Sequence, residues 1–196
     1  MILPIVAYGD PVLKRVGQDI DAEYPNLAEL IDNMYETMYN AYGVGLAAPQ
    51  IGLPIRLFII DTTPFSEDED LTEEEINTLK AFNKVFINAK ITEEEGDEWA
   101  FNEGCLSIPD VREDVFRKSK ITIEYLDENF EKHKDTYDGL IARVIQHEYD
   151  HIDGILFTEK LSTLKKRLIK GRLDNISKGK VRVDYKMRFP KQKKRR

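Results

Sequence analysis

The chain has 196 residues, of which 41% are hydrophobic and 10% aromatic, enough for one sizeable core or two small ones. It contains no apolar run of the roughly 18 residues that a membrane-spanning helix needs. The first ten residues lack the basic start of a secretory signal. A single cysteine, Cys105, excludes an internal disulfide framework. These features predict a globular protein of the reducing cytoplasm without a membrane partner.

The net charge of −7 is unevenly distributed along the chain. Residues 160–196 contain 16 Lys and Arg against 2 acidic residues, whereas the remaining residues contain 13 basic against 34 acidic ones. Basic tails of this kind commonly meet phosphate backbones. The basic segment therefore either binds a nucleic acid or forms a solvated helix face with a disordered, solubilising tip.

Apolar spacing predicts the elements of the first half of the chain. Leucine, isoleucine, methionine and tyrosine recur at three- and four-residue intervals, which predicts an amphipathic helix over 26–41 that ends before Gly43. A buried strand is expected at 55–61 and an alternating strand at 84–92. Between them lies an acidic insertion, 62–80, in which we expect one or two helical turns near 72–80.

The second half of the chain shows a hairpin followed by two helices. Strands at 121–126 and 130–137 flank the turn 127–129, and apolar stripes predict helices over about 139–153 and 161–173. Residues 181–187 alternate like an added strand, before a loose basic tip. Antiparallel strands with separate helices indicate an α+β fold. We expect one domain over 1–175 and a basic C-terminal extension over 176–196.

The clearest chemical motif is the segment Gln146–His151, which reads QHEYDH. On a helix, residues four apart lie on the same face, so His147 and His151 are placed to bind one metal ion. Glu148, beside the first ligand, is placed to reach a water molecule at the metal. Leu140 and Val144 lie on the same face, so we expect them either to line a substrate pocket or to pack in the core.

A catalytic metal needs a third protein ligand and an open position. Phe157 occupies the place of the third histidine of the extended protease pattern and cannot bind a metal, whereas His133 lies in a charged hairpin arm typical of the surface. Glu159 follows the helix too closely to be favoured. Cys105 lies in a shaped turn containing Gly104, and its thiolate would bind zinc or ferrous iron well. A site of one cysteine and two histidines is therefore predicted.

A third segment, Gly43–Gln50, reads GVGLAAPQ. Its small residues would let the backbone approach a ligand, and Gln50 offers an amide donor that could face an oxyanion. Taken alone this pattern is also typical of an ordinary loop.

Together, the three segments resemble the motifs of peptide deformylases. These motifs are G-x-G-x-A-A-x-Q at 43–50, E-G-C-L-S at 103–107 and Q-H-E-x-D-H at 146–151, in this order, and the similarity spans about residues 2–175. The resemblance implies a hydrolase that removes the N-formyl group from the initiator methionine of nascent polypeptides, releasing formate by means of metal-bound water or hydroxide. It also implies antiparallel sheets around a central metal-bearing helix, with a C-terminal helix.

The resemblance also implies a role for individual residues. One divalent ion, most often Fe²⁺ but also Zn²⁺ or Ni²⁺, would be held by Cys105, His147 and His151. Glu148 would be the general acid and base. Gln50 and the Leu106 N–H would face the oxyanion, whereas Gly45 and, by analogy, Arg112 would bind the peptide.

The expected partners are nascent formylated polypeptides and, through the basic C-terminal segment, the ribosome; we expect a monomer. The acidic insertion and the C-terminal extension are longer than in a minimal member of the family, and neither is expected to touch the metal ligands. Two alternatives remain at this point. One is a metallo-endopeptidase with the same helix motif, and the other is a non-catalytic, metal-containing protein that binds RNA or the ribosome.

Overall fold

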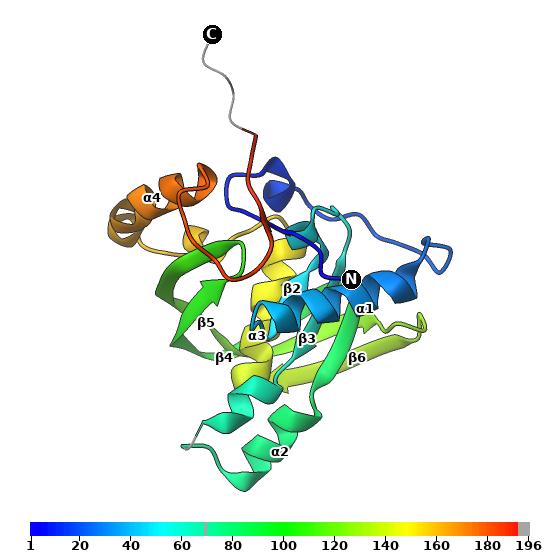
Figure 1. Ribbon diagram of the computed structural model, residues 1–196. Coiled ribbons are helices and arrows are strands. Elements are labelled where there is room, and N and C mark those ends of the chain that lie inside the picture. The colour runs from blue at the N-terminus through cyan, green and yellow to red at the C-terminus, as the bar shows by residue number, and fades with distance from the viewer. Residues whose placement is uncertain (69, 192–196) are drawn as a thin grey trace.

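The computed structural model describes residues 1–68 and 70–191, and within these residues seven strands and four α-helices follow one another (Figure 1). The strands are β1 (Ile5–Val6), β2 (Gly45–Ala47), β3 (Leu57–Asp61), β4 (Asn83–Cys105), β5 (Ile108–Leu126), β6 (Lys132–Asp138) and β7 (Met187–Arg188). The helices are α1 (Leu27–Asn40), α2 (Glu73–Ala81), α3 (Gly139–Ile152) and α4 (Thr163–Ser177). Among these helices none combines the length and the hydropathy of a membrane span.

Five antiparallel strands form the main sheet, in the order β2-β3-β4-β5-β6. Every residue of β3 is buried, because helices cover both faces of the sheet at this point. Leu57 and Ile59 belong to the same apolar cluster as the buried face of α1, whereas Phe58 and Ile60 cluster with Ile145 of α3. The continuous apolar run at 57–60 is thus explained by burial on two sides.

Helix α3 lies at the centre of the molecule, against β2, β3 and β5 (Figure 1). It is buried on almost all sides, although many of its buried residues are polar or charged. Charged side chains are rarely buried unless they are paired, so this composition marks α3 as the element that carries a function.

Strands β4 and β5 form a long twisted hairpin whose tip carries Cys105. The predicted strand at 84–92 continues to residue 105, and the predicted strand at 121–126 begins already at Ile108. Cys105 pairs with Ile108 across a two-residue turn, Leu106–Ser107. The hairpin therefore brings a cysteine 42 positions before His147 to the side of α3.

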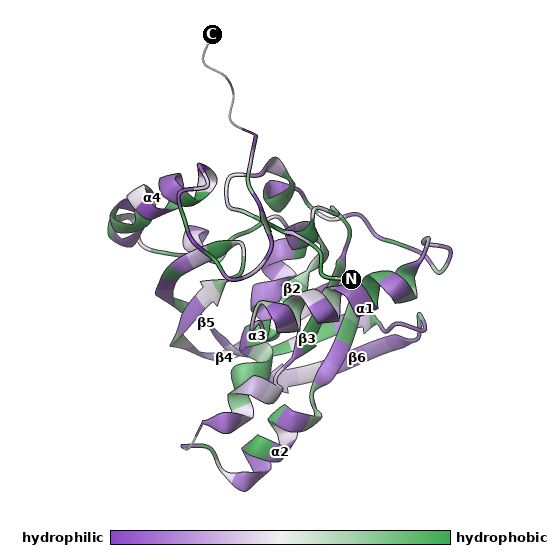
Figure 2. Cartoon of the chain, in the orientation of Figure 1, coloured by the Kyte–Doolittle hydropathy of each residue, from purple (hydrophilic) through white to green (hydrophobic). Residues whose placement is uncertain are grey.

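The C-terminal segment returns to the N-terminus. Helix α4 packs through Ile169, Leu173 and Ile176, and in Figure 2 both α1 and α4 carry hydrophobic and hydrophilic residues along their length. β7 then pairs in parallel with β1, which the red and dark blue segments of Figure 1 show.

The predicted strand at 181–187 is wrong in its extent. Only Met187 and Arg188 are a strand, because β1 offers no more than two residues for pairing. The expected loose tip includes residues 192–196, which lie outside the described residues.

The α+β fold with antiparallel pairing around a central helix and a C-terminal helix is confirmed. In the acidic insertion, the expected helical turns are α2, whose Thr72 and Glu75 form a capping box. No β1 or β2 was predicted, because strands of two or three residues leave no periodicity to detect.

Candidate metal centre

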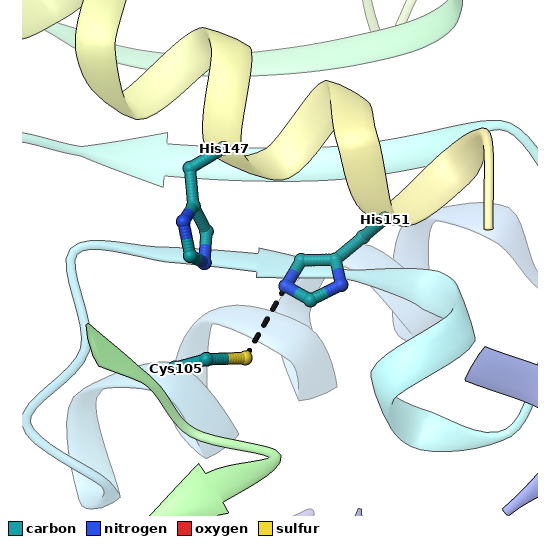
Figure 3. Close-up of side chains that lie close together, drawn as sticks. All are labelled: Cys105, His147 and His151. Carbon is teal, nitrogen blue, oxygen red and sulfur yellow. Dashed lines mark hydrogen bonds between the residues drawn. The ribbon is translucent and has the colours of Figure 1, made fainter. Parts of the chain in front are cut away.

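The two histidines of α3 point in one direction, toward Cys105 at the hairpin tip (Figure 3). The sulfur of Cys105 lies 3.3 Å from Nε2 of His151, and one ligand atom from each of Cys105, His147 and His151 lies within 4.8 Å of the others. Two ligands of a tetrahedral zinc ion lie about 3.5 Å apart, because Zn–S is about 2.3 Å and Zn–N about 2.1 Å. The three side chains therefore fit one divalent cation, and their number leaves a coordination position open.

A buried carboxylate fixes the orientation of His147. Oε2 of Glu103 lies 2.9 Å from Nδ1 of His147, so the opposite ring nitrogen, Nε2, faces Cys105. Carboxylate partners of this kind set the tautomer of a metal-binding histidine and raise its basicity. Although burial raises the pKa of Glu103, its bonds to Arg117 and His147 outweigh burial and lower it. The carboxylate thus stays ionised.

Two buried arginines compensate the charge of Glu103. Arg117 binds both carboxylate oxygens, at 2.7 and 2.9 Å, and Arg143 donates to Oε1 at 3.0 Å. Arg117 also reaches Asp150 of α3 at 2.6 Å. The guanidinium of Arg143 lies 4.4 Å from the centre of the Trp99 ring and donates to the Trp99 carbonyl. This network ties the hairpin to α3.

The charges around the two imidazoles differ. Burial lowers the pKa of both rings, but hydrogen bonds to Cys105 and Glu103 raise that of His147 to about 10. For His151, burial and the neighbouring His147 keep the pKa well below its usual value. A bound cation takes the place of protons at such ligands, because histidine and cysteine bind metals in their deprotonated forms.

Glu148 lies beside the three candidate ligands and is almost completely buried, with 4% of its surface exposed. Burial raises its pKa to about 7. Among the described residues, none donates a hydrogen bond to its Oε2 atom. A carboxyl group with a pKa near neutrality and a free oxygen is suited to accept and return a proton.

Gly45 of β2 makes room for Glu148. A Cβ atom at this position would lie 2.7 Å from Cγ of Glu148 and would also collide with its carboxylate. Gly45 is therefore needed because the backbone of β2 passes directly over the Glu148 side chain.

Gln50 presents its amide NH₂ group to the site. Its Oε1 atom accepts a hydrogen bond from the Ala47 N–H at 2.8 Å, so Nε2 is directed to the sulfur of Cys105 at 3.5 Å. Leu106 follows Cys105 directly in the turn of the hairpin, and both residues line the same cavity as Gln50. Two hydrogen-bond donors, the Gln50 amide and the Leu106 N–H, thus belong to the surroundings of the candidate metal.

A cavity of about 670 Å³ opens onto Cys105, His147 and Glu148. Of the residues predicted to bind a substrate, Gly45, Arg112 and Val144 line it. Arg112 is held by Asn102, whose side-chain and main-chain oxygens accept from it at 2.9 and 2.6 Å. Leu140 is not among the lining residues and packs instead against the apolar cluster of α3 and β3. It lies on the same face of α3 as Val144, but one turn nearer the start of the helix, beyond the residues that line the cavity.

The acidic insertion and the C-terminal extension both contribute residues to this cavity. Pro64 and Phe65 come from the acidic insertion, and Arg182 to Tyr185 come from the C-terminal extension. Among the described residues of these segments none is a candidate metal ligand, but both segments form walls beside the ligands.

The other candidate ligands lie elsewhere. The ring of Phe157 stacks on that of His147 at 6.1 Å, and Glu159 forms an ion pair with Lys14. His133 lies on β6 and contacts Asp127 at 2.8 Å. The alternative of an endopeptidase with a downstream third ligand therefore finds no support.

Sequence reasoning did not assign a role to Glu103, Arg117, Arg143 or Asp150. Glu103 and Asp150 belong to the motifs at 103–107 and 146–151, and Arg143 lies just before the second of these motifs. A sequence does not show, however, which charged residue of a strand points inward. One signal was present: Arg143 and Asp150 lie on the predicted apolar helix, at positions where a charge needs a buried partner.

The chain is similar in sequence to proteins of one known family. A family model described as polypeptide deformylase matches residues 2–167. A protein named peptide deformylase from Christiangramia forsetii is 70% identical over 196 residues, covering 100% of both chains. One of the same name from Flavobacterium johnsoniae is 67% identical over 196 residues, also covering 100% of both chains. These two relatives align with the C-terminal extension, which the family model does not reach.

Solved structures show the same fold. The crystal structure of a peptide deformylase from Legionella pneumophila superposes with a TM-score of 0.77 at 36% identity, covering 93% of this chain and 99% of that one. The crystal structure of peptide deformylase from Thermus thermophilus gives a TM-score of 0.78 at 38% identity, covering 91% of this chain and 99% of that one.

Proposed function

Since the chain belongs to the polypeptide deformylase family, whose enzymes remove the N-formyl group from peptides with the help of a metal ion, we propose that Cys105, His147 and His151 hold this metal. The observation that carries the proposal is the approach of the Cys105 sulfur to His151, at 3.3 Å, beside a His147 ring oriented by Glu103. When bound, a divalent ion lowers the pKa of water to about 7 and polarises a carbonyl oxygen.

Glu148 acts as the general base and then as the general acid. Its free oxygen takes a proton from the attacking water, and the same group returns the proton to the amine that leaves. The pKa of about 7 that burial gives it suits both steps. Gly45 allows the carboxylate to occupy this position.

Gln50 and the Leu106 N–H stabilise the negative charge that develops on the formyl oxygen. Gln50 is fixed by the Ala47 N–H, so its amide group needs no reorganisation during the reaction. Arg112, held by Asn102 at the cavity, binds the peptide chain, and Val144 borders the methionine side chain. Leu140 supports Val144 from the core without touching the substrate.

The test is formate release from formyl-Met-Ala by the purified enzyme under anaerobic conditions, with metal analysis of the same sample. Glu148→Ala should reduce turnover by at least 100-fold while the metal content stays unchanged, because Glu148 is not a ligand. Cys105→Ala should remove the metal and the activity together. Turnover by Glu148→Ala at the wild-type rate would refute the assigned role, and full metal retention in Cys105→Ala would refute the ligand set.

We propose Fe²⁺ as the native ion, with Zn²⁺ and Ni²⁺ as ions that the same ligands accept. One thiolate and two imidazoles suit all three, and selection among them follows availability as much as geometry. Anaerobic purification should yield iron, and the sample should lose activity in air as the iron is oxidised. A zinc content equal to the protein concentration after anaerobic purification would contradict this assignment.

We further propose that the enzyme acts in the cytoplasm as a monomer, on nascent chains, and docks on the ribosome through the basic residues of α4. Support for a monomer comes from the candidate metal ligands, all three of which one chain supplies. Support for docking comes from Lys166, Arg167 and Lys170, which are exposed. Binding driven by such charges should weaken steeply as salt increases.

Because Leu161, Ile169 and Leu173 are buried, substitution tests this docking better than truncation. Reversing Lys166, Arg167 and Lys170 to Glu should abolish co-sedimentation with ribosomes at low salt and leave formate release from a free peptide unchanged. The matched control reverses the same number of exposed charges on the strands, at Lys90, Lys132 and Lys134. Equal loss of binding in both triple variants would refute α4 as the docking element.

A further inference from the structure

The C-terminal extension reaches the turn that follows the candidate metal ligand Cys105. The hydroxyl of Tyr185 donates a hydrogen bond to the Leu106 carbonyl at 2.7 Å. The next carbonyl of the turn, that of Ser107, accepts from the Tyr8 N–H at 2.8 Å. Both carbonyls of the two-residue turn are therefore held by segments from the two ends of the described chain.

The extension itself is firmly seated. Ile5 donates to the Lys186 carbonyl at 2.8 Å and Ala7 to the Arg188 carbonyl at 2.9 Å, which pairs β1 with β7. Along 181–188 odd-numbered side chains are half-buried and even-numbered ones exposed. Tyr185 and Met187 pack against the apolar cluster that includes Ile5. Because the extension is fixed in this way, the Tyr185 hydroxyl has a defined position from which it holds the Leu106 turn.

The same segment borders the active-site cavity. Arg182, Val183, Asp184 and Tyr185 line the cavity that opens onto His147 and Glu148. Burial raises the pKa of Tyr185, so its hydroxyl remains a proton donor at neutral pH. Arg182 and Asp184 add one exposed charge of each sign to this wall.

We propose that residues 182–185 of the extension form a wall of the peptide-binding cleft, and that Tyr185 is a positioning residue that holds the Leu106 turn. This inference rests on the proposed function, since Leu106 supplies an oxyanion donor there. Losing the Tyr185 hydroxyl frees the turn and displaces the Leu106 N–H from the developing charge, whereas losing Arg182 or Asp184 removes contacts only to the residues that follow formylmethionine. The peptide chain beyond the first residue is the ligand of this wall.

The experiment measures kcat and KM for formyl-Met-Ala and for the longer formyl-Met-Ala-Ala-Ser with the full-length, metal-loaded enzyme. Tyr185→Phe should lower kcat about 3- to 10-fold for both substrates, as the loss of one neutral hydrogen bond implies, with unchanged KM, metal content and melting temperature. Arg182→Ala and Asp184→Ala should raise KM for the longer peptide about 3- to 10-fold and leave the shorter one unaffected. Matched controls are Tyr24→Phe, which removes a hydroxyl outside the cavity, and Lys180→Ala, which removes an exposed charge beside the wall.

The results separate the inference from the proposed function. Formate release by the wild type together with Tyr185→Phe kinetics equal to those of Tyr24→Phe would overturn the positioning role. A fall in kcat that is matched by loss of metal or of melting temperature would also overturn it, because it would indicate a general structural role. Equal KM changes for both peptides in Arg182→Ala and Asp184→Ala would refute the proposal that residues 182–185 form a wall of the peptide-binding cleft. Absence of formate release by the wild type would instead refute the proposed function itself.

Discussion

Replacing Glu103 by Gln removes the one negative charge shared by two buried arginines and His147. Arg117 is 5% and Arg143 1% exposed, so neither guanidinium regains water when the carboxylate is lost. The glutamine amide keeps the shape of the side chain, but its NH₂ group would face donors. Breaking a buried ion pair by removing one partner costs about 3–5 kcal/mol. In a protein of this size each kcal/mol shifts the melting temperature by roughly 2–4 °C, so the expected decrease is about 6–20 °C.

The assay is thermal unfolding followed by circular dichroism, on metal-free and on metal-loaded protein. In the loaded form a further change is expected, because loss of the partner of a metal-binding histidine weakens metal affinity about 10- to 100-fold, which competition with a chelator measures. Glu124→Gln is the control: it breaks an exposed pair with Lys134 at 3.0 Å, which contributes little to stability because water screens it. If Glu103→Gln melted within 2 °C of Glu124→Gln, the network would not stabilise the junction of hairpin and helix.

Three further changes test other parts of the site and fold. Gly45→Ala should lower kcat about 100-fold with metal retained, because the new Cβ displaces Glu148; wild-type kcat in a formate assay would refute this. Gln50→Glu keeps an acceptor for the Ala47 N–H but loses the NH₂ group that donates to the oxyanion. We therefore expect kcat to fall about 100- to 1000-fold. A fall in KM alone would contradict the oxyanion role. Asp61→Asn should lower the melting temperature at pH 7. Burial raises the pKa of Asp61, but hydrogen bonds from Thr63 and Tyr39 outweigh burial and lower the pKa, so the ionised carboxylate stabilises the fold. This stabilisation is lost as pH falls below about 4, through the lowered pKa of Asp61. The difference in melting temperature between the wild type and Asp61→Asn should therefore be smaller at pH 3 than at pH 7.

Local periodicity predicted the elements that carry the site, but not how far they extend. Helices 26–41 and 139–153 were placed within two residues of α1 and α3, since each buries one or more apolar stripes. The extension of β4 through Glu93–Glu98 was not predicted, because these acidic residues are mostly exposed and resemble a loop. They form a strand because β5 pairs with them, partly through Lys118 and Lys120 opposite Glu98 and Glu95.

The candidate metal ligands were chosen from the sequence because two imidazoles four residues apart share one helix face. Cys105 was then the remaining candidate once Phe157, His133 and Glu159 had been set aside. The groups that orient them were not. Glu103 alternates with outward-facing residues on β4, and its partners Arg117 and Arg143 come from a different strand and from α3. Such pairing depends on the register of the hairpin, which contains several shifts. The hydrogen bond from Tyr185 to the Leu106 carbonyl likewise depends on the pairing of β1 with β7.

That parallel pairing has a consequence for the order in which the molecule is completed during synthesis. Residues 5 and 6 are made long before their partners, residues 187 and 188. A growing chain can form the hairpin and helix α3 well before these partners exist, and contacts between such distant residues are the slow ones to close. The turn after Cys105 would thus gain its hydrogen bond from Tyr185 only after the residues of the hairpin and of α3 have all been made.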